Sequence, residues 1–276
     1  MSIALHNRQS RLATIGGAMV LSVVAIALFA PWLAPYDPLR AVADSFGEPF
    51  APQRAYLLGT DELGRDIFSR LIYGARISLL VAGAATAMTM VIGTSVGLAA
   101  GYFGGWVDTT LMRVTDVVLA LPDILLALAL VALIGPGLAS ILVVIGLVRW
   151  AGIARTVRAE VLTLRERDFM LAATALGASP VRVMLRHLLP NTLPTVVVMT
   201  ALATSGAIVL DAGLSYLGLG VPVPTPSWGR MLSDSQTFYR TAPWLMVFPG
   251  LAIVYAVVAF NFLGHGLLAF VARREG

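Results

Sequence analysis

Side chains that could perform enzyme chemistry are scarce in this chain of 276 residues. The chain has three histidines, far apart in the sequence, and neither cysteine nor lysine. Without cysteine there is no disulfide, thiol nucleophile or thiolate metal site, and without lysine there is no phosphate-binding lysine of a Walker A loop. The HExxH and GxSxG patterns are also absent. The sequence therefore predicts a protein that is not an enzyme and that itself binds no metal and no cofactor.

Three acidic residues are more informative because they lie within or beside long apolar runs: Asp116, Asp123 and Asp211. A charge inside a bilayer is unfavourable unless it faces a protein-lined cavity or pairs with another group. Buried polar residues of a helix bundle commonly hold helices together instead of binding a substrate. Two roles therefore stay open for these aspartates, and for His265: packing of the bundle, or a position along a translocation path.

The elements that must position these residues are membrane helices. Hydrophobic residues make up 58% of the chain and charged residues 12%, with a mean hydropathy of +0.85, which is typical of multi-span membrane proteins. The pI near 9.8 could indicate a nucleic-acid partner. The arginines, however, are scattered among apolar runs, which favours a role in membrane orientation. We expect the lipid bilayer, and no nucleic acid, around this chain.

Four uncharged runs are long enough to cross about 30 Å of hydrocarbon, which takes roughly 20 helical residues. The first run exceeds the roughly 7 to 15 apolar residues of a signal peptide, so we interpret it as an uncleaved first span. The four runs are Leu12 to Tyr36, Ile77 to Val107, His187 to Leu210 and Thr241 to Ala272.

A fifth uncharged run, Ile124 to Val148, contains the helix breaker Gly135-Pro136-Gly137 and is either one broken span or part of two. One span gives five crossings, with 5 arginines inside and 14 outside. Two spans, of about Thr109 to Ile134 and about Leu138 to Ile153, give six crossings with 12 arginines inside and 7 outside. The positive-inside rule therefore favours six transmembrane helices with both termini in the cytoplasm.

Two further patterns predict local structure. Gly93, Gly97 and Gly101 form overlapping GxxxG units on one helix face, which indicates close packing against another helix. The charges between Asp61 and Asp66 could form a charged site, but helix capping and local ion pairs account for them more simply.

The polar interruption between two apolar runs, RDFMLAATALGASPVRVMLRHLLPN, covers Arg167 to Asn191. Its first half predicts a short helix, with Asp168 as the N-cap and Gly177 in a left-handed C-terminal cap. Four apolar residues at spacing i, i+3, i+4 and i+7 share one face of that helix: Phe169, Ala172, Ala173 and Leu176.

The second half restarts a helix, with Ser179 as the N-cap, Pro180 as the first helical residue and Pro190 at the end. Two such helices could lie in the membrane interface. The mostly alanine face of the first helix and the direct junction of the second with an apolar span favour an element that docks on a partner and transmits force. Arg182 and Arg186 share one face of the second helix; its apolar face is Val181, Met184, Leu185 and Leu188.

The residues AATALG and LLP within this unit resemble the EAA loop in permease subunits of ATP-binding-cassette (ABC) importers. In that family Glu-Ala-Ala, a Gly four residues after the second Ala and a later Leu-Pro belong to coupling helices, which sit in a groove of an ATPase subunit. Leu171 stands at the position of the family Glu, although Glu166 and Asp168 lie nearby. A second permease subunit could carry the full motif. The matching positions are Ala172, Ala173, Gly177, Leu189 and Pro190.

Three longer stretches resemble the C-type permease subunits of dipeptide, oligopeptide and nickel importers. They are LGTDELGRDIFSRLIYGARISLL (Leu58 to Leu80), GLSYLGLGVPVPTPSWGRML (Gly213 to Leu232) and FPGLAIVYAVVAFNFLGHGL (Phe248 to Leu267). With the loop above they are distributed along nearly the whole chain after Pro35. The resemblance implies an all-α membrane protein with six transmembrane helices, the type I ABC importer permease fold and cytoplasmic coupling helices.

The organisation that follows has four parts. Residues 1–35 are an N-terminal tail and the first transmembrane helix, 36–76 an external loop, 77–272 a five-helix permease core with the coupling loop at about 165–190, and 273–276 a cytoplasmic tail. The resemblance and the helix pattern together assign to the ATPase-coupling loop Asp168, Leu171, Ala172, Ala173, Gly177, Ser179, Pro180, Arg182, Leu189 and Pro190.

The resemblance also implies partners in the bacterial inner membrane. They are a second permease subunit in a heterodimer, two ABC ATPase subunits that bind ATP and Mg, and an external substrate-binding protein. The chain would form half of a channel for di- and oligopeptides. Nickel or metallophore import by the same subunit type is the alternative, less favoured because no His or Met cluster suggests metal ligation.

Two further classes of membrane protein remain as alternatives. An ion-coupled secondary transporter would show inverted repeats and broken spans with charges at the midplane. The sequence shows no such repeat. A structural scaffold of the membrane would not need the cytoplasmic two-helix unit.

Overall fold

The computed structural model describes residues 2–43 and 47–271, and for residues 2–10, 171, 174 and 269–271 it describes only the backbone. Within these ranges the chain is helical, and its only extended pairings are two isolated β-bridges, Ala41 with Arg65 and Thr60 with Asp66. The expectation of an all-α membrane protein is confirmed.

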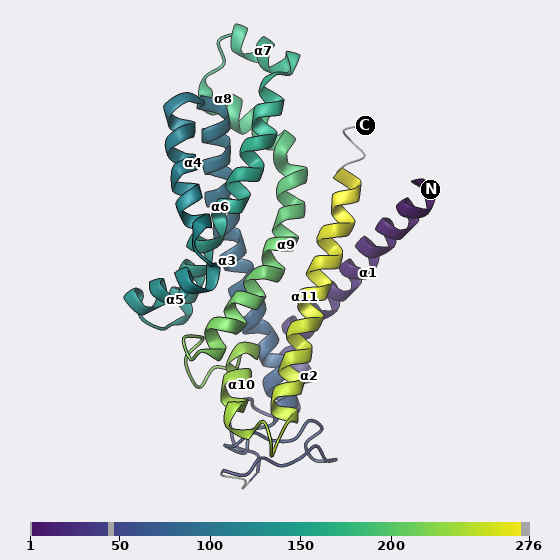
Figure 1. Cartoon of the computed structure of the whole chain (residues 1–276). Coiled ribbons are helices and arrows are strands. Elements are labelled where there is room, and N and C mark those ends of the chain that lie inside the picture. The colour runs from purple at the N-terminus through teal and green to yellow at the C-terminus, as the bar shows by residue number, and fades with distance from the viewer. Residues whose placement is uncertain (1, 44–46, 272–276) are drawn as a thin grey trace.

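Five long helices form the bundle, and shorter helices join them (Figure 1). The long helices are α1 (Ser2–Leu28), α3 (Ile67–Phe103), α6 (Leu138–Arg165), α9 (Leu189–Tyr216) and α11 (Trp244–Val271). The shorter ones are α2 (Ala30–Leu33), α4 (Gly105–Ala120), α5 (Asp123–Ile134), α7 (Asp168–Ala175), α8 (Pro180–Val183), the π-helix η1 (Met184–Leu188), α10 (Trp228–Asp234) and the 3₁₀-helix η2 (Ser235–Phe238).

Each of the five long helices is part of a segment long and apolar enough to cross a membrane, and α4 with α5 qualifies as a bent pair. Counted as one span, this pair brings the number of candidate spans to six, as expected. The N-terminal end of α1 and the C-terminal end of α11 point toward the end of the bundle that carries α7 (Figure 1). The loop before α3 lies at the opposite end, together with α10.

The third span, predicted over about Thr109 to Ile134, is not one continuous helix. The structure breaks it after Ala120, and α4 and α5 meet at 95°. Leu121 has an extended backbone, with φ −98° and ψ 136°. The helical backbone conformation is disfavoured for a residue that precedes a proline. Pro122 follows Leu121, and this steric restriction explains why the helix ends here.

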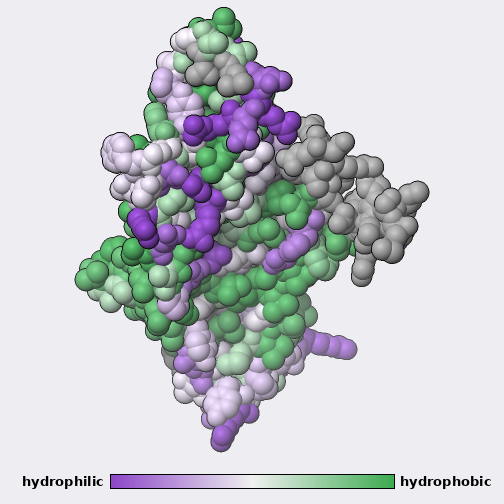
Figure 2. All heavy atoms as spheres, turned by 45° about the horizontal axis from the view of Figure 1, so that its top comes forward, coloured by the Kyte–Doolittle hydropathy of each residue, from purple (hydrophilic) through white to green (hydrophobic). Residues whose placement is uncertain are grey.

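The second and fourth spans continue beyond their apolar runs. α3 begins at Ile67, ten residues before the predicted Ile77, and α6 runs on to Arg165 instead of stopping near Ile153. The 37 residues of α3 extend over about 55 Å at 1.5 Å per residue, well beyond a hydrocarbon core of about 30 Å. These helices therefore carry polar residues outside the membrane, and Figure 2 shows hydrophilic side chains gathered toward the α7 end while hydrophobic ones cover the middle of the bundle.

The centre of the bundle is the contact between α3 and α6. A Cβ atom added at Gly93 would lie 2.6 Å from the Cβ of Ile153, and one at Gly97 would lie 2.7 Å from the carbonyl oxygen of Ala154. Gly101 meets α6 in the same way one turn further on, 2.7 Å from Val161. The close helix packing predicted from the GxxxG pattern is confirmed, because the absence of side chains at these glycines lets the two backbones approach.

We predict that Gly97→Leu weakens this contact, since no side chain fits between the helices. Overpacking typically lowers the free energy of unfolding by about 1–3 kcal/mol. Thermal unfolding of the purified subunit complex in detergent would measure the loss. Gly83→Ala on the same helix is the matched control, because a Cβ at Gly83 meets nothing within 4 Å. Equal melting temperatures for both variants and the unmodified protein would contradict the assignment.

Candidate functional site

α7 projects from the end of the bundle and is joined to α6 by only two residues, Glu166 and Arg167 (Figure 1). The amide of Arg167 donates to the carbonyl of Leu164 at 3.1 Å, which closes the turn between the helices. Asp168 was predicted to precede the helix as its cap, but it is the first helical residue. A carboxylate in the first turn still interacts favourably with the helix dipole.

The side chains of α7 divide differently from the predicted face. Met170 and Ala173 are buried, and Met170 belongs to one apolar cluster with Val183 and Leu188. Ala172 is exposed, as are two large apolar side chains, Phe169 at 40% and Leu176 at 88%. The predicted face is therefore wrong in part: Ala173 points inward, while the other three residues point away from the protein.

The turn after α7 has the predicted chemistry. Gly177 has φ +74°, a conformation that glycine adopts without strain, and the amide of Ala178 donates to the carbonyl of Ala173 at 3.1 Å. Ser179 occupies the N-cap position of α8 with an extended backbone, and Pro180 is the first helical residue. The helix, glycine turn, helix arrangement is confirmed.

The second helix of the unit continues directly into the bundle. α8, the π-helix η1 and α9 form one uninterrupted stretch from Pro180 to Tyr216, so Pro190 lies in the first turn of α9 instead of ending the unit. A proline inside a helix lacks an N–H and crowds the carbonyl of the preceding turn. The wider π turn, in which the amide of Leu189 donates to the carbonyl of Met184, precedes this position.

The π turn also changes which side chains are buried. Val183 and Leu188, five residues apart, are fully buried, whereas Val181 and Leu185 of the predicted apolar face are exposed. A π turn places residues i and i+5 near one another, and the i, i+3, i+4, i+7 rule assumes an α-helix. Of the other predicted coupling residues, Arg182 and Pro190 are exposed and Leu189 is half-buried. The side chain of Leu171 lies outside the described part of the structure.

The aspartates of the third span are paired with arginines of α6. Asp116 accepts a hydrogen bond from Arg155 at 2.6 Å, and Asp123 accepts one from Arg149 at 2.9 Å. A third pair, which the sequence did not suggest, joins Asp108 and Arg158 through two hydrogen bonds. The signal available in the sequence was only that α6 carries arginines and α4 aspartates.

Asp211 and His265 are not part of this series. Asp211 is buried in α9, and its Oδ1 atom has no hydrogen-bond partner among the described residues. His265 is exposed on α11, where Nδ1 lies 2.9 Å from the carbonyl oxygen of Asn261 in the preceding turn. Within the described residues Asp211 forms no ion pair, so it does not belong to the arginine-paired series of Asp116 and Asp123.

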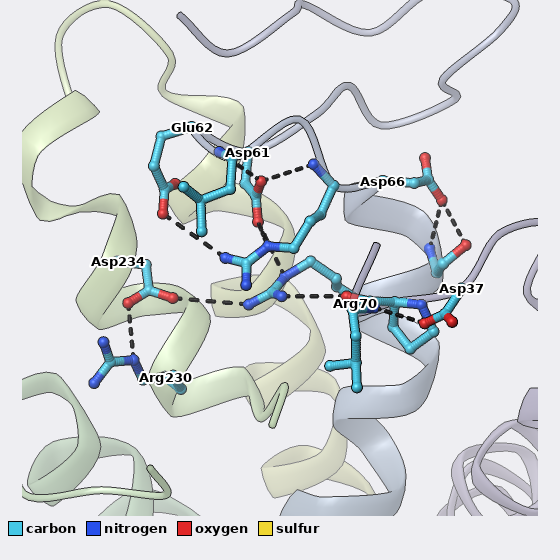
Figure 3. Close-up of polar contacts among 12 residues, drawn as sticks. Asp37, Asp61, Glu62, Asp66, Arg70, Arg230 and Asp234 are labelled. Carbon is cyan, nitrogen blue, oxygen red and sulfur yellow. Dashed lines mark hydrogen bonds and ion pairs between the residues drawn. The ribbon is translucent and has the colours of Figure 1, made fainter. Parts of the chain in front are cut away.

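A second set of charges lies at the opposite end of the bundle, where α3 begins (Figure 3). Asp61 is buried and pairs with Arg65 at 2.7 Å and with Arg70 at 3.3 Å. Asp66 caps α3 by accepting from the amide of Ser69 at 2.8 Å. The predicted helix cap and local ion pairs are confirmed. Burial raises the pKa of the Glu62 carboxyl, which lies beside this set, above its ordinary value.

Arg70 extends the set beyond what the sequence predicted. Its guanidinium donates to the carbonyl of Pro38 at 3.3 Å and lies 3.7 Å from the carboxylate of Asp234 in α10, which in turn pairs with Arg230 (Figure 3). One buried arginine thus joins three segments that are far apart in the chain. From the sequence, Arg70 was expected in the external loop before the second span, and its distant partners were not predicted.

The described residues contain no group of three or more His, Asp or Glu side chains placed to hold a metal ion. The chemistry of both charged sets is that of ion pairs between arginine and carboxylates.

Comparison with known proteins identifies the family to which this helical architecture belongs. Residues 93–275 match the family described as binding-protein-dependent transport system inner membrane component, and residues 7–52 match the N-terminal TM domain of oligopeptide transport permease C. The dipeptide transport system permease protein DppC of Alkalihalophilus pseudofirmus is 42% identical over 260 residues, which cover 94% of this chain and 85% of that protein.

Two further relatives are similar to the same extent. The di/tripeptide transport system permease protein DppC of Pseudomonas aeruginosa is 41% identical over 267 residues, 95% of this chain and 87% of that protein. The glutathione transport system permease protein GsiD of Escherichia coli O157:H7 is 41% identical over 260 residues, 94% of this chain and 86% of that protein.

We predict that Arg70→Met destabilises the end of the bundle that carries α10, because it leaves the carboxylate of Asp61 buried with one cation fewer. Breaking a buried ion pair typically lowers the free energy of unfolding by about 3–5 kcal/mol. Arg40→Met is the control, since the pair of Arg40 with Asp37 is 84% and 46% exposed and such surface pairs contribute only about 0–1 kcal/mol. Thermal unfolding and protease cleavage within residues 47–66 would measure both. Similar behaviour of the two variants would argue against the proposed role of Arg70.

Proposed function

This chain belongs to the family of binding-protein-dependent transport system inner membrane components and is a permease subunit of an ABC importer; we propose that it forms half of a channel through which di- and oligopeptides enter the cell. The relatives support this substrate class, because their names specify dipeptides, di- and tripeptides, and glutathione. All three are short chains of amide-linked amino acids. The chain is a transport subunit, and we assign ATP binding and hydrolysis to partner ATPase subunits.

The alternatives are less well supported. Nothing among the relatives named above favours nickel or metallophore import, and no metal-ligand group occurs in the described residues. A broken span with a charge pair, which we expected of an ion-coupled secondary transporter, does occur at α4 and α5. Family membership nevertheless places the chain among binding-protein-dependent systems, so the broken span does not argue for that class.

The observation that carries the proposed coupling role is the exposed apolar surface of α7. Phe169, Ala172 and Leu176 point away from the protein at its polar end, and Leu176 is 88% exposed. Exposed apolar groups gathered in this way mark interaction sites. We assign α7 to the groove of an ATPase subunit, and Met170 and Ala173 to the inner side that holds α7 on the bundle.

The connections of α7 give a route for force. On one side the two-residue link joins it to α6, and on the other the Gly177 turn leads into the continuous stretch from Pro180 to Tyr216. When the ATPase subunits close, displacement of α7 would therefore move α6 and α9 together. Because α9 also packs on α3, α10 and α11, that motion would reach the opposite end and switch access to the channel.

The remaining partners follow from the family and from the arrangement of the ends. A second permease subunit, two ATPase subunits and an external substrate-binding protein complete the importer that we propose. The positive-inside rule and the position of both terminal helix ends on the α7 side support a cytoplasmic location for α7 and both termini. The substrate-binding protein would then dock at the end formed by α10 and residues 47–66.

We predict that Leu176→Asp uncouples the transporter without unfolding it. Leu176 is exposed, so the change removes no internal contact, but a charged group would be desolvated in an apolar groove. The complex would be purified by a tag on this chain from membranes of its native host, and the amount of ATPase subunits recovered would be measured. We expect a large loss of ATPase subunits for Leu176→Asp and near-normal recovery for Leu176→Met.

A second variant tests the turn. Gly177→Pro imposes φ near −65° at a residue with φ +74°, so peptide uptake should be abolished while the chain still inserts into the membrane. Unchanged uptake would refute the coupling assignment. Purification of the unmodified chain without any ATPase or second permease would sink the proposed function as a whole.

A further inference from the structure

The ion pair of Asp123 and Arg149 lies at the break of the third span. Asp123 is the first residue of α5, directly after the 95° bend, and its Oδ2 atom is 2.9 Å from Nη1 of Arg149 in α6. The side chain of Asp123 is 48% exposed and that of Arg149 is 28% exposed. The pair is therefore accessible from one side and held by protein on the other.

A third helix holds the guanidinium in place. A Cβ atom at Gly206 of α9 would lie 2.3 Å from Nη2 and 2.7 Å from Cζ of Arg149, so glycine at this position is what admits the arginine. The Nε atom of Arg149 is buried and has no hydrogen-bond partner within the described part of the chain. Arginine has five N–H donors, and one of them is thus directed inward without a partner.

The position along α6 places this pair in the membrane. Arg149 lies about 16 Å from the first residue of α6, Leu138, at 1.5 Å per residue. The residues between Asp123 and Arg149 in the sequence, Ile124 to Val148, are all uncharged. Charged side chains at this depth are unfavourable against lipid and face a partner protein or a water-filled path.

The other two pairs of the series lie nearer to α7 and join only α4 with α6. Arg155 and Arg158 are six and nine residues further along α6, toward its polar end at Arg165. Arg158 and Arg149 are equally exposed, at 29% and 28%, while Asp108 is more buried than Asp123, at 18% against 48%. Their role as a clamp between α4 and α6 needs no ligand, and they make a matched comparison.

We propose that Asp123 and Arg149 form a subsite of the translocation path for the two charged termini of a short peptide. Arg149 binds the peptide α-carboxylate and Asp123 binds its α-ammonium group. This inference rests on the proposed function, because it names residues that contact the substrate of the channel. It adds a binding role for the pair to the helix contact that the structure already shows.

The pair suits this task because its charges are balanced in both states. In the empty channel the two side chains neutralise one another, so no bare charge remains in the membrane. When a peptide arrives, each side chain exchanges its partner for a peptide terminus of the same charge type, and the net charge of the site stays zero. Such an exchange favours passage over tight binding.

Recognition of the termini is independent of the peptide sequence. Every free peptide has one α-ammonium and one α-carboxylate group, whatever its side chains. Ile124 and Leu125, which follow Asp123, are exposed and offer apolar surface without directional demands. A site of this kind suits a transporter that accepts many peptides.

The test uses the complete complex in proteoliposomes with its binding protein, ATP and a radiolabelled dipeptide. It measures three quantities for Asp123→Asn and Arg149→Gln: peptide uptake, ATPase activity stimulated by the loaded binding protein, and recovery of the second permease subunit. We expect uptake per ATP hydrolysed to fall about tenfold or more, the effect of losing a hydrogen bond to a charged group, while the other two quantities are retained.

Asp108→Asn is the control, because it removes an ion pair between the same span and α6. It should leave uptake per ATP unchanged. An equal loss in this control would show that the pairs act only as helix clamps and would overturn the proposal. Loss of the second permease from Asp123→Asn would also overturn it, since the pair would then face that partner.

A conservative variant covers the case in which the Asp123→Asn chain itself fails to fold and insert into the membrane. Arg149→Lys keeps the opposite charges but replaces the planar guanidinium, so we expect a higher KM for the peptide with stimulated ATPase activity retained. An unchanged KM would overturn the subsite. Absence of peptide uptake by the unmodified complex is a different result, since it refutes the proposed function itself.

Discussion

The close contact between α3 and α6 is the constraint on which the rest of the molecule depends. Three glycines of α3 remove the side chains that would separate the two backbones, and Val157 and Val161 of α6 fill the space. At the end of this contact Arg165 donates to the carbonyl of Gly101 at 2.9 Å, beside the tight connection into α4. α6 is thereby fixed in position, and it carries both the arginines that hold the third span and the link to α7.

Charge is handled in this protein by pairing across helices. Asp108, Asp116 and Asp123 each meet an arginine of α6, and at the opposite end Arg70 lies between Asp61 and Asp234. In a protein whose main solvent is lipid, an isolated charge is the most unfavourable group, and paired charges also determine which helices are neighbours. The ion pairs therefore both stabilise the bundle and determine how its helices are arranged.

The two ends of the bundle are connected through α9. At the α7 end this helix begins directly after the π turn, and about 40 Å away, over its 28 residues, it packs under α10. There the amide of Trp228 donates to Ser78 of α3 at 3.1 Å, and its indole N–H donates to the carbonyl of Leu71 at 3.0 Å. A structural change at one end of the bundle therefore acts on helices that also build the opposite end.

The sequence by itself determined the spans, the glycine contact and the glycine turn, because each depends on composition or on spacing within one helix. Apolar runs locate spans whatever surrounds them, and Gly177 needs only its own φ. The family resemblance rests on short motifs for the same reason. Because apolar runs depend on composition alone, the predicted all-α class and the count of six spans are correct although the third span is bent.

Only the tertiary structure decided which residues meet. The docking face of α7 was predicted from α-helical spacing, but burial of Met170 on the other side depends on where Val183 and Leu188 lie after the π turn. The partners of Asp123 and Arg70 are set by how helices cross, and the sequence distance between partners carries no such information. A single sequence reports the preferences of each segment; the contacts between segments arise from the packing of backbones whose relative positions no local pattern specifies.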